Sequence, residues 1–384
     1  MTHVERMKAM FEGGRFDRLV RQPFGFFPQT HERWQKEGMP EAVTHGGKGF
    51  REYFGFDPSV WLGQGVDLGW CEAPLVPRYE EKILRTVGGH EIVQDFIGRH
   101  KAYPVGQREQ VMPTYLKHTV ASRADWEEEV RPRLDADTPE RWEGFDEKMA
   151  EQTEAVARGE GLRNAGVIGG YMYLRSLIGP VDLLYRFYDE PELLHDMMRH
   201  WRDLMLTCLR RSQDAGGPFY RFMLAEDICY KSGPLISPDM MREFLSPYYR
   251  DVYDELQSHQ SEKLHFEIDT DGDCRPVIDV YQECGVDAMS PFEVASGCDV
   301  VKIGRQYPAL HMRGGIDKRV LARGPDAIDE MLAYIMPAMT KRGRYIPSSD
   351  HAVPDDVSLD NYRHYRKRVM EMDAFRKARD ACCP

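Results

Sequence analysis

Short apolar segments of strand length alternate with longer helical patterns after about residue 160, and this alternation limits the fold more than any other feature. The predicted strands are residues 164–169, 221–225, 263–268, 288–291, 310–313 and 344–347. The main predicted helices are residues 191–215, 238–259, 276–283, 325–339 and 359–379. Strict alternation is typical of parallel βαβ units, so the sequence predicts an α/β protein. No G-x-G-x-x-G turn follows these strands, which argues against a dinucleotide-binding doubly wound sheet.

We expect one (β/α)8 TIM barrel that includes all 384 residues, because barrels of this length are common as single domains. Residues 161–384 supply regular β/α units, and residues 1–160 form an irregular N-terminal part. This part starts with a helical extension, and residues 21–27 are a candidate first strand. Alternating residues between 82 and 119, interrupted by Gly88-Gly89, predict a small antiparallel β-hairpin insertion.

Composition excludes several classes of protein. The formal net charge of −12 argues against binding to nucleic acid, whose phosphates are negative. No stretch approaches the roughly 18 consecutive apolar residues of a membrane span. Residues 1–16 also lack the apolar core of a secretory leader, so we expect a cytoplasmic protein without membrane segments. The eight cysteines include no C-x-x-C pair and do not form the pattern of a disulfide framework.

Acidic residues follow most of the predicted strands. Because the carboxyl ends of the strands meet at one rim of a parallel barrel, we expect these side chains to surround a common mouth. Capping of the next helix is a simpler explanation for a single aspartate, notably Asp227 or Asp273, but explains the whole set less well. The rim residues are Glu226, Asp227, Asp269, Asp271, Asp273, Glu293, Asp317, Lys318, Asp350 and His351.

Crowded carboxylates need compensating cations, because their mutual repulsion raises their energy. Lys318, Arg313, Arg175 and Arg21 are candidate cations, and a divalent metal or the substrate is the alternative. The tyrosines in Gly169-Gly170-Tyr171-Met172-Tyr173 are predicted to form a flat wall for a ligand. The predicted substrate-binding residues are Arg21, Tyr171, Tyr173, Arg175, Glu226, Asp227, Asp273 and Glu293.

The segment Asp269-Thr270-Asp271-Gly272-Asp273 superficially matches part of an EF-hand loop. Val280 stands where the calcium-binding Glu is required, so a calcium loop is disfavoured. Two interpretations stay open. The loop is either a hydrogen-bonding floor for a polar ligand, or it binds zinc or another divalent metal through Asp269 and Asp271 together with His351.

Several motifs resemble those of the uroporphyrinogen decarboxylase superfamily, which also contains corrinoid-linked methyltransferases. They are residues 233–238 (GPLISP), 269–273 (DTDGD), 285–288 (GVDA), 314–317 (GGID) and 345–351 (YIPSSDH). The arginine-rich signature of the porphyrin decarboxylases does not occur in the sequence at residues 21–27. Alignment on Gly272 puts Asp269 and Asp271 at the His and Cys of the methyltransferase zinc site, and His351 at its later Cys.

The resemblance implies an enzyme that acts on a small polar or methylated substrate, with methyl transfer involving a corrinoid protein as the leading reaction. Here Asp269, Asp271 and His351 bind a metal, while Glu293 and Asp317 position the substrate. The alternative is a cofactor-free decarboxylase, in which Lys318, Arg175 or Arg21 holds a carboxylate and His351 or Asp271 donates the proton. The predicted catalytic residues are His351, Asp271, Asp317 and Lys318. A non-catalytic binding barrel and a homodimer are left open.

Overall fold

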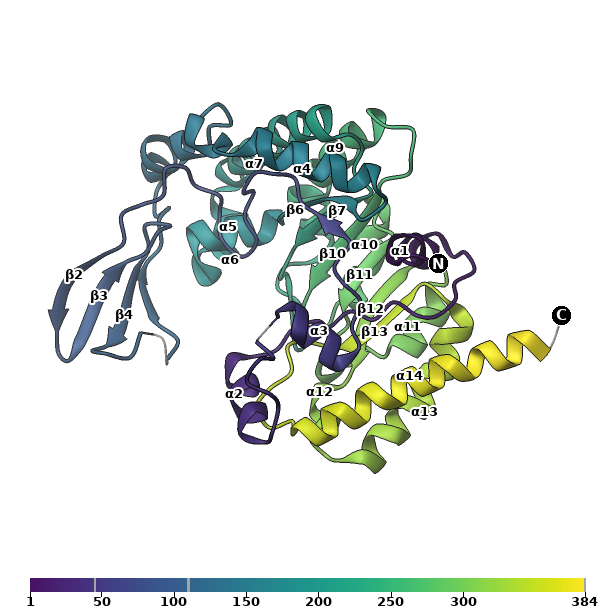
Figure 1. Cartoon of the computed structure of the whole chain (residues 1–384). Helices are drawn as coiled ribbons and strands as arrows, with labels where there is room; N and C mark the ends of the chain where they lie inside the picture. Colours follow the sequence, from purple (N-terminus) through teal and green to yellow (C-terminus); the bar gives the residue numbers. More distant parts are fainter. Residues whose placement is uncertain (45, 109–110, 383–384) are drawn as a thin grey trace.

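The computed structural model describes residues 1–44, 46–108 and 111–382, with side chains as far as residue 373. Its centre is a curled parallel sheet of seven strands in the order β1-β6-β7-β10-β11-β12-β13 (Figure 1). The strands are β1 (Trp61–Leu62), β6 (Leu162–Ile168), β7 (Arg221–Ala225), β10 (His265–Thr270), β11 (Ala288–Pro291), β12 (His311–Ile316) and β13 (Tyr345–Ser349).

The sheet is a half-barrel and not the closed eight-stranded barrel that we expected. Within the described residues, β1 and β13 stand at opposite edges of the sheet order and form no ladder with each other. The candidate strand at residues 21–27 is reduced to an isolated parallel bridge between Phe26 and Val353. Pro23 lacks an amide donor and Pro28 starts the next helix, so little of this segment can pair as a strand.

Helices cover the outer face of the sheet, as the alternation of segments predicted. Ser237 caps α8 by accepting the amide N–H of Met240 at 3.1 Å, and Pro238 is its first residue, as the sequence indicated. None of the described helices is long and apolar enough to cross a membrane. The helices after β6 are α5 (Gly170–Ile178), α6 (Pro180–Asp189), α7 (Pro191–Gly216), α8 (Pro238–Phe244), α9 (Ser246–Ser258), α10 (Ile278–Glu283), α11 (Val300–Gln306), α12 (Lys318–Leu321), α13 (Pro325–Arg342) and α14 (Leu359–Cys382).

The helices of the N-terminal part pack against the half-barrel at two places. Helix α1 (His3–Glu12) lies over the N-terminal ends of the strands, where Phe11 stacks on His311 with ring centroids 4.0 Å apart. Helices α2 (Pro28–Lys36) and α3 (Lys48–Phe54) enclose an aromatic cluster with Tyr362 of α14, which includes Trp34 and Phe50. Helix α4 (Phe145–Ala157) packs against α7.

Residues 82–117 form a separate antiparallel sheet of four strands where the sequence suggested one hairpin. The strands are β2 (Lys82–Val87), β3 (His90–Gln94), β4 (His100–Pro104) and β5 (Thr114–Lys117), in that order. Gly88 and Gly89, both with positive φ, form the turn between β2 and β3. This sheet projects from the body of the molecule (Figure 1), and we call it the arm.

Candidate active site

A cavity of about 520 Å³ opens where the carboxyl ends of β7 and β10 meet. Six of the residues around it are ionisable acids or arginines, so charged groups line part of the cavity. Its apolar walls come from the irregular N-terminal part, from α5 and from β7. The residues that line it are Phe24, Trp70, Cys71, Asn164, Met172, Arg221, Met223, Ala225, Glu226, Asp227, Asp269, Asp271, Arg313 and His351.

Glu226 follows β7 directly and is almost completely buried, with 1% of its surface exposed. Its Oε1 accepts the amide N–H of Tyr171 at 3.0 Å, whereas its Oε2 has no hydrogen-bond partner among the described residues. Burial raises the pKa of Glu226 to about 8. Near neutral pH this carboxyl group is therefore largely protonated, and its buried Oε2 has no partner for that proton in the described part of the chain.

Tyr249 of α9 also contacts this carboxyl group. Its hydroxyl oxygen accepts the amide N–H of Gly170 at 2.9 Å, so its own O–H is left to donate to Glu226. Gly169 makes room for this arrangement, because a β-carbon at that position would overlap Glu226 Oε2. The end of β6 and the start of α5 thus form a close-fitting support for one carboxyl group.

An ion-paired layer lies below the mouth, inside the half-barrel. Arg221 pairs with Glu267, and its Nε donates to Asn164 at 2.7 Å. Arg313 reaches Asp269 at 3.3 Å and Glu267 at 4.0 Å. Both arginines that line the cavity therefore already face carboxylates.

Asp269 is held by the hydroxyl of Ser290, which donates to its carboxylate at 2.8 Å, and by Arg313. Burial raises the pKa of Asp269 to about 6. His351 instead pairs with Asp271, 3.2 Å away, and this contact raises the pKa of the imidazole. Phe24 lies against the same imidazole with ring centroids 5.5 Å apart.

The three predicted metal ligands do not form one centre. Asp271 and His351 contact each other, while Asp269 is turned to Ser290 and Arg313. Among the described residues, no three His, Cys, Asp or Glu side chains are arranged to hold a metal ion. Because a metal site needs convergent donors, the residues present do not fit the expected divalent metal.

Asp227 and Arg175, two further predicted residues, meet at the edge of the cavity. Arg175 Nη2 lies 3.5 Å from the Asp227 carboxylate, which lines the cavity. Burial first, and then the charge of Asp271, raise the pKa of Asp227. Arg175 is therefore already engaged by a carboxylate of the protein.

Glu293 and Lys318 lie beside the mouth without lining it. Lys318 Nζ is 3.3 Å from Glu293 Oε1, and Glu293 Oε2 accepts the amide N–H of Gly272 at 3.1 Å. The pair thus fixes the turn that carries Asp271. Lys318 also donates its backbone N–H to Asp350, whose side chain is fully buried.

Three other predicted residues turn away from the cavity. Asp273 binds Arg275 at 2.7 Å, and Asp317 caps α12 and binds Arg319 at 2.8 Å. These contacts agree with the simpler explanation that each aspartate caps the turn or helix that follows it. In both cases the carboxylate accepts the backbone N–H of the residue two positions further along. Arg21 lies 3.7 Å from Asp373 of α14 and is not part of the cavity wall.

The predicted tyrosine wall is not on the cavity. Tyr171 and Tyr173 are both buried within α5, because the helix turns them into the core; Met172 between them lines the cavity. Trp70, with 48% of its surface exposed, supplies an aromatic wall that the sequence analysis missed. Trp70 lies in the irregular part of the chain, where no periodic pattern marked it.

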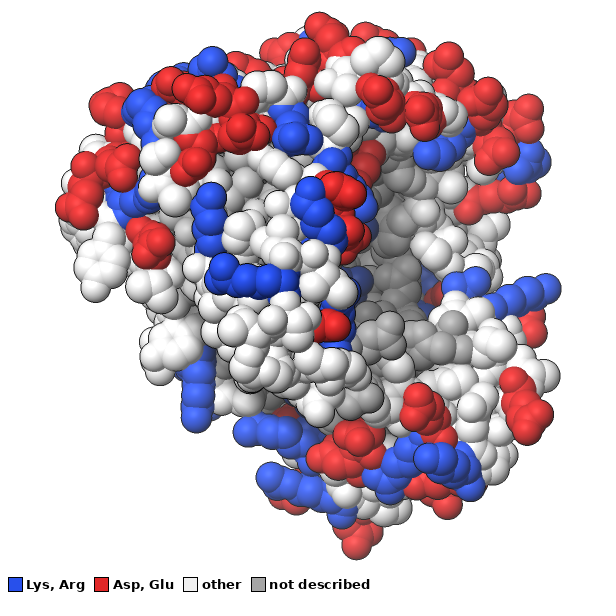
Figure 2. All heavy atoms as spheres, turned by 90° about the vertical axis from the view of Figure 1, so that its left-hand side faces the viewer, with Lys and Arg blue, Asp and Glu red and all other residues white. Residues whose placement is uncertain are grey.

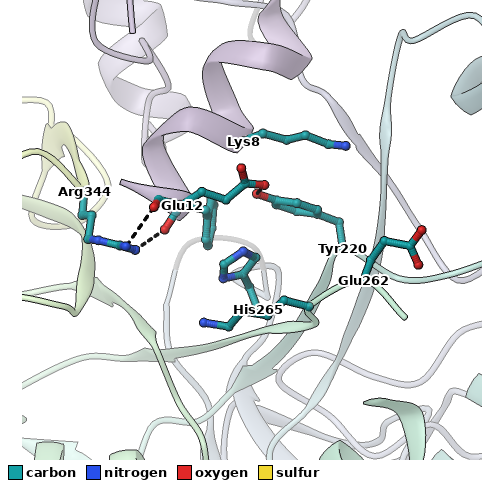
Figure 3. Close-up of a pocket in the computed structure, with 8 residues that line it drawn as sticks. Lys8, Glu12, Tyr220, Glu262, His265 and Arg344 are labelled. Carbon is teal, nitrogen blue, oxygen red and sulfur yellow. Dashed lines mark hydrogen bonds between the residues drawn. The ribbon is translucent and has the colours of Figure 1, made fainter. Parts of the chain in front are cut away.

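A second cavity of about 310 Å³ lies at the opposite, N-terminal end of the strands (Figure 3). Tyr220 donates its O–H to Glu12 of α1 at 3.2 Å, and His265 contacts Asp287 at 2.8 Å. Arg344 donates to backbone carbonyls of α1 (Figure 3). These bonds attach α1 to the sheet, so we assign this end to stability and the rim cavity to chemistry.

Comparisons with known proteins identify the family and the fold. The sequence profile of the uroporphyrinogen decarboxylase (URO-D) family matches residues 163–372. A methyltransferase from Methanosarcina mazei has a similar structure, with a TM-score of 0.59 and 14% identity over 97% of this chain and 99% of that one. A B12-independent methionine synthase from Shewanella sp. W3-18-1 gives a TM-score of 0.35 and 9% identity over 61% of this chain and 67% of that one. No curated protein sequence matches the chain.

Proposed function

Because the chain belongs to the URO-D family, we propose that it is an enzyme that removes a methyl group from a small polar substrate in the rim cavity. A corrinoid on a partner protein is the proposed methyl acceptor. The observation that carries the proposal is Glu226, a buried carboxyl group among the residues that line the cavity, whose Oε2 has no hydrogen-bond partner among the described residues. A methyltransferase of known structure shares this fold, so the fold is compatible with such a reaction.

Glu226 supplies what a methyl ether needs in order to lose its methyl group. The methyl carbon bonds to the acceptor while its bond to oxygen breaks, and the oxygen keeps the electron pair. That oxygen takes the proton of Glu226 and leaves as an alcohol, as in general acid catalysis. The carboxylate that remains accepts hydrogen bonds from the Tyr171 amide and the Tyr249 hydroxyl, and solvent later returns the proton.

The cations around the cavity favour methyl transfer over decarboxylation. A decarboxylase needs a positive group to hold the carboxylate of its substrate. Arg221, Arg313 and Arg175 each already face a carboxylate of the protein. Decarboxylation is still a second candidate, because Glu226 could equally protonate the carbanion left after loss of carbon dioxide.

One experiment separates the two reactions. The purified full chain is incubated with a panel of small methyl ethers and of carboxylic acids, each with reduced cobalamin present as methyl acceptor. We expect demethylated alcohol by mass spectrometry, no carbon dioxide, and unchanged activity after chelation of divalent metals. Release of carbon dioxide without demethylation would establish the decarboxylase. Loss of activity on chelation would show that the reaction requires a bound divalent metal.

A further inference from the structure

Two buried thiols contact each other next to the rim of the sheet. Lysine, arginine, aspartate and glutamate side chains gather on the upper and lower parts of the face shown in Figure 2. Cys274 and Cys298 instead lie inside the molecule, with 1% and 0% of their surfaces exposed. Their sulfur atoms are 3.8 Å apart. Among the described cysteines, no other two share a hydrogen bond, so this pair is placed for a reaction between thiols.

The pair belongs to the loops that carry the rim cavity. Cys274 follows β10 and Cys298 follows β11, and these two strands are parallel neighbours. Cys298 Sγ donates to the carbonyl of Gly272 at 3.4 Å, while the amide N–H of Gly272 donates to Glu293 at 3.1 Å. The loop after β11 thus holds both backbone polar groups of Gly272. Asp271, which lines the cavity, directly precedes Gly272, so the thiols lie next to the turn that carries Asp271.

Cys298 is the more nucleophilic of the two thiols. Because Cys298 donates its own S–H to Gly272, the hydrogen bond between the sulfurs comes from Cys274, and it lowers the pKa of Cys298. The positive charge of Arg275 acts in the same direction. A thiolate is the form of cysteine that attacks an oxidant. Cys298 is therefore suited to react first, and Cys274 to form the bond that follows.

A bond between the two sulfurs would displace the turn at Gly272. The sulfur–sulfur distance of a disulfide is about 2.05 Å, so the two atoms must approach each other by about 1.8 Å. Bond formation also removes the S–H group that Cys298 donates to Gly272. The turn is closely packed, because a β-carbon at Gly272 would lie 2.7 Å from the backbone of Cys229 and Tyr230. Closely packed interiors transmit such shifts, so the change reaches Asp271.

We propose that Cys274 and Cys298 are a modification site, at which a peroxide forms a reversible disulfide that displaces Asp271 and slows the reaction in the rim cavity. The Cys298 thiolate attacks one peroxide oxygen, the O–O bond breaks, and the departing hydroxide takes the thiol proton and leaves as water. The sulfur of Cys274 then attacks the sulfenic acid on Cys298, the S–O bond breaks, and a second water leaves with the proton of Cys274. Two electrons pass from the thiols to the peroxide. The effect on the reaction rests on the proposed function, whereas the disulfide does not.

Peptide mapping of the full chain tests the disulfide. The protein is reduced, freed of reductant, treated with hydrogen peroxide, and its remaining thiols are blocked with N-ethylmaleimide. Digestion after glutamate cuts the chain at Glu283 and Glu293, so Cys274, Cys284 and Cys298 fall in three different peptides. We expect a cross-linked pair of peptides that contains Cys274 and Cys298, with two hydrogen atoms fewer than the separate peptides. Dithiothreitol should separate them, although it does not reverse oxidation of methionine or of cysteine to sulfinic acid.

Two measurements test the effect on the rim. Peroxide should lower the rate of demethylation by about tenfold or more, and dithiothreitol should restore it. The disulfide is quantified again after each assay, because reduced cobalamin can reduce it. Amide hydrogen exchange of residues 269–274 needs no substrate and should differ between the two redox states. Cys274→Ser and Cys298→Ser should abolish both differences. Cys284→Ser is the matched control and should retain them, because Cys284 is equally buried but donates to the Val280 carbonyl.

Three results would overturn the proposal. Peptides with Cys274 and Cys298 that remain separate after peroxide treatment show that the pair does not form a disulfide. A cross-link of either residue to Cys229 means that the wrong pair is assigned. A Cys274–Cys298 disulfide with unchanged hydrogen exchange and an unchanged rate refutes control of the rim. A chain that demethylates nothing but passes the mapping and exchange tests refutes the proposed function and supports the disulfide.

Discussion

The amide N–H of Tyr171 and the hydroxyl of Tyr249 both donate to Glu226, and each stabilises the ionised form of the carboxyl group. Burial opposes them and has the larger effect, so the pKa of Glu226 is raised to about 8. The protonated form is the proton donor in the proposed reaction. The rate constant should therefore fall as pH increases through the pKa of Glu226.

Tyr249→Phe should move this pH dependence. The substitution removes one donor to the ionised carboxylate, so the pKa of Glu226 rises and activity persists to higher pH than in the wild type. Measuring kcat from about pH 6 to about pH 10 tests the shift. Tyr253→Phe on the same helix is the control, because the Tyr253 hydroxyl donates to the Leu264 carbonyl and does not contact Glu226. Superimposable profiles for the wild type and Tyr249→Phe would refute the role of Tyr249.

At the residue scale, the sequence located the rim but not the direction of its side chains. Glu226, Asp227 and Asp271 reach the cavity, as their positions after the strands indicated. Asp273 and Asp317 follow strands in the same way, yet each binds an arginine two residues further along. Strand spacing fixes the position of a backbone at the rim, whereas the side chain turns to its strongest local partner.

At the scale of elements, strands that are fully buried were predictable, and the shortest, half-buried strand was not. Strands β7 and β11 have the predicted bounds, because their apolar runs are buried on both faces of the sheet. Strand β1 has only two residues and carries no pattern that distinguishes it from a loop. The edge of the half-barrel depends on this short strand, so the open sheet could not be foreseen from alternation alone.

The junction between β6 and α5 gives a prediction at this scale. Gly169→Ala puts a β-carbon into the space of Glu226 Oε2, so the carboxyl group must move. We expect a loss of stability of about 1–3 kcal/mol, as for other overpacked sites, together with a large loss of activity. Denaturant unfolding and the demethylation assay measure the two effects. Gly63→Ala, where nothing lies within 4 Å of the added carbon, should change neither. Full activity of Gly169→Ala would contradict the described packing.

At the scale of the whole molecule, the parallel sheet separates two functions at its two ends. The N-terminal end is bound to α1 through contacts such as Tyr220 to Glu12. The C-terminal end leaves an open cavity lined with acidic residues. A parallel sheet makes this division natural, because its loops at one end vary while the other end holds the structure together. The arm contributes no residue to either cavity.

The most direct test of this account compares kcat for demethylation in two carboxyl-to-amide variants, one at each end of the sheet. Glu226→Gln keeps the shape of the side chain but removes the acidic proton, so kcat should fall by about 10²–10⁴-fold. Glu12→Gln at the N-terminal cavity should leave kcat unchanged. If Glu226→Gln retains the wild-type kcat, or if Glu12→Gln abolishes it, the rim cavity is not the site of the reaction.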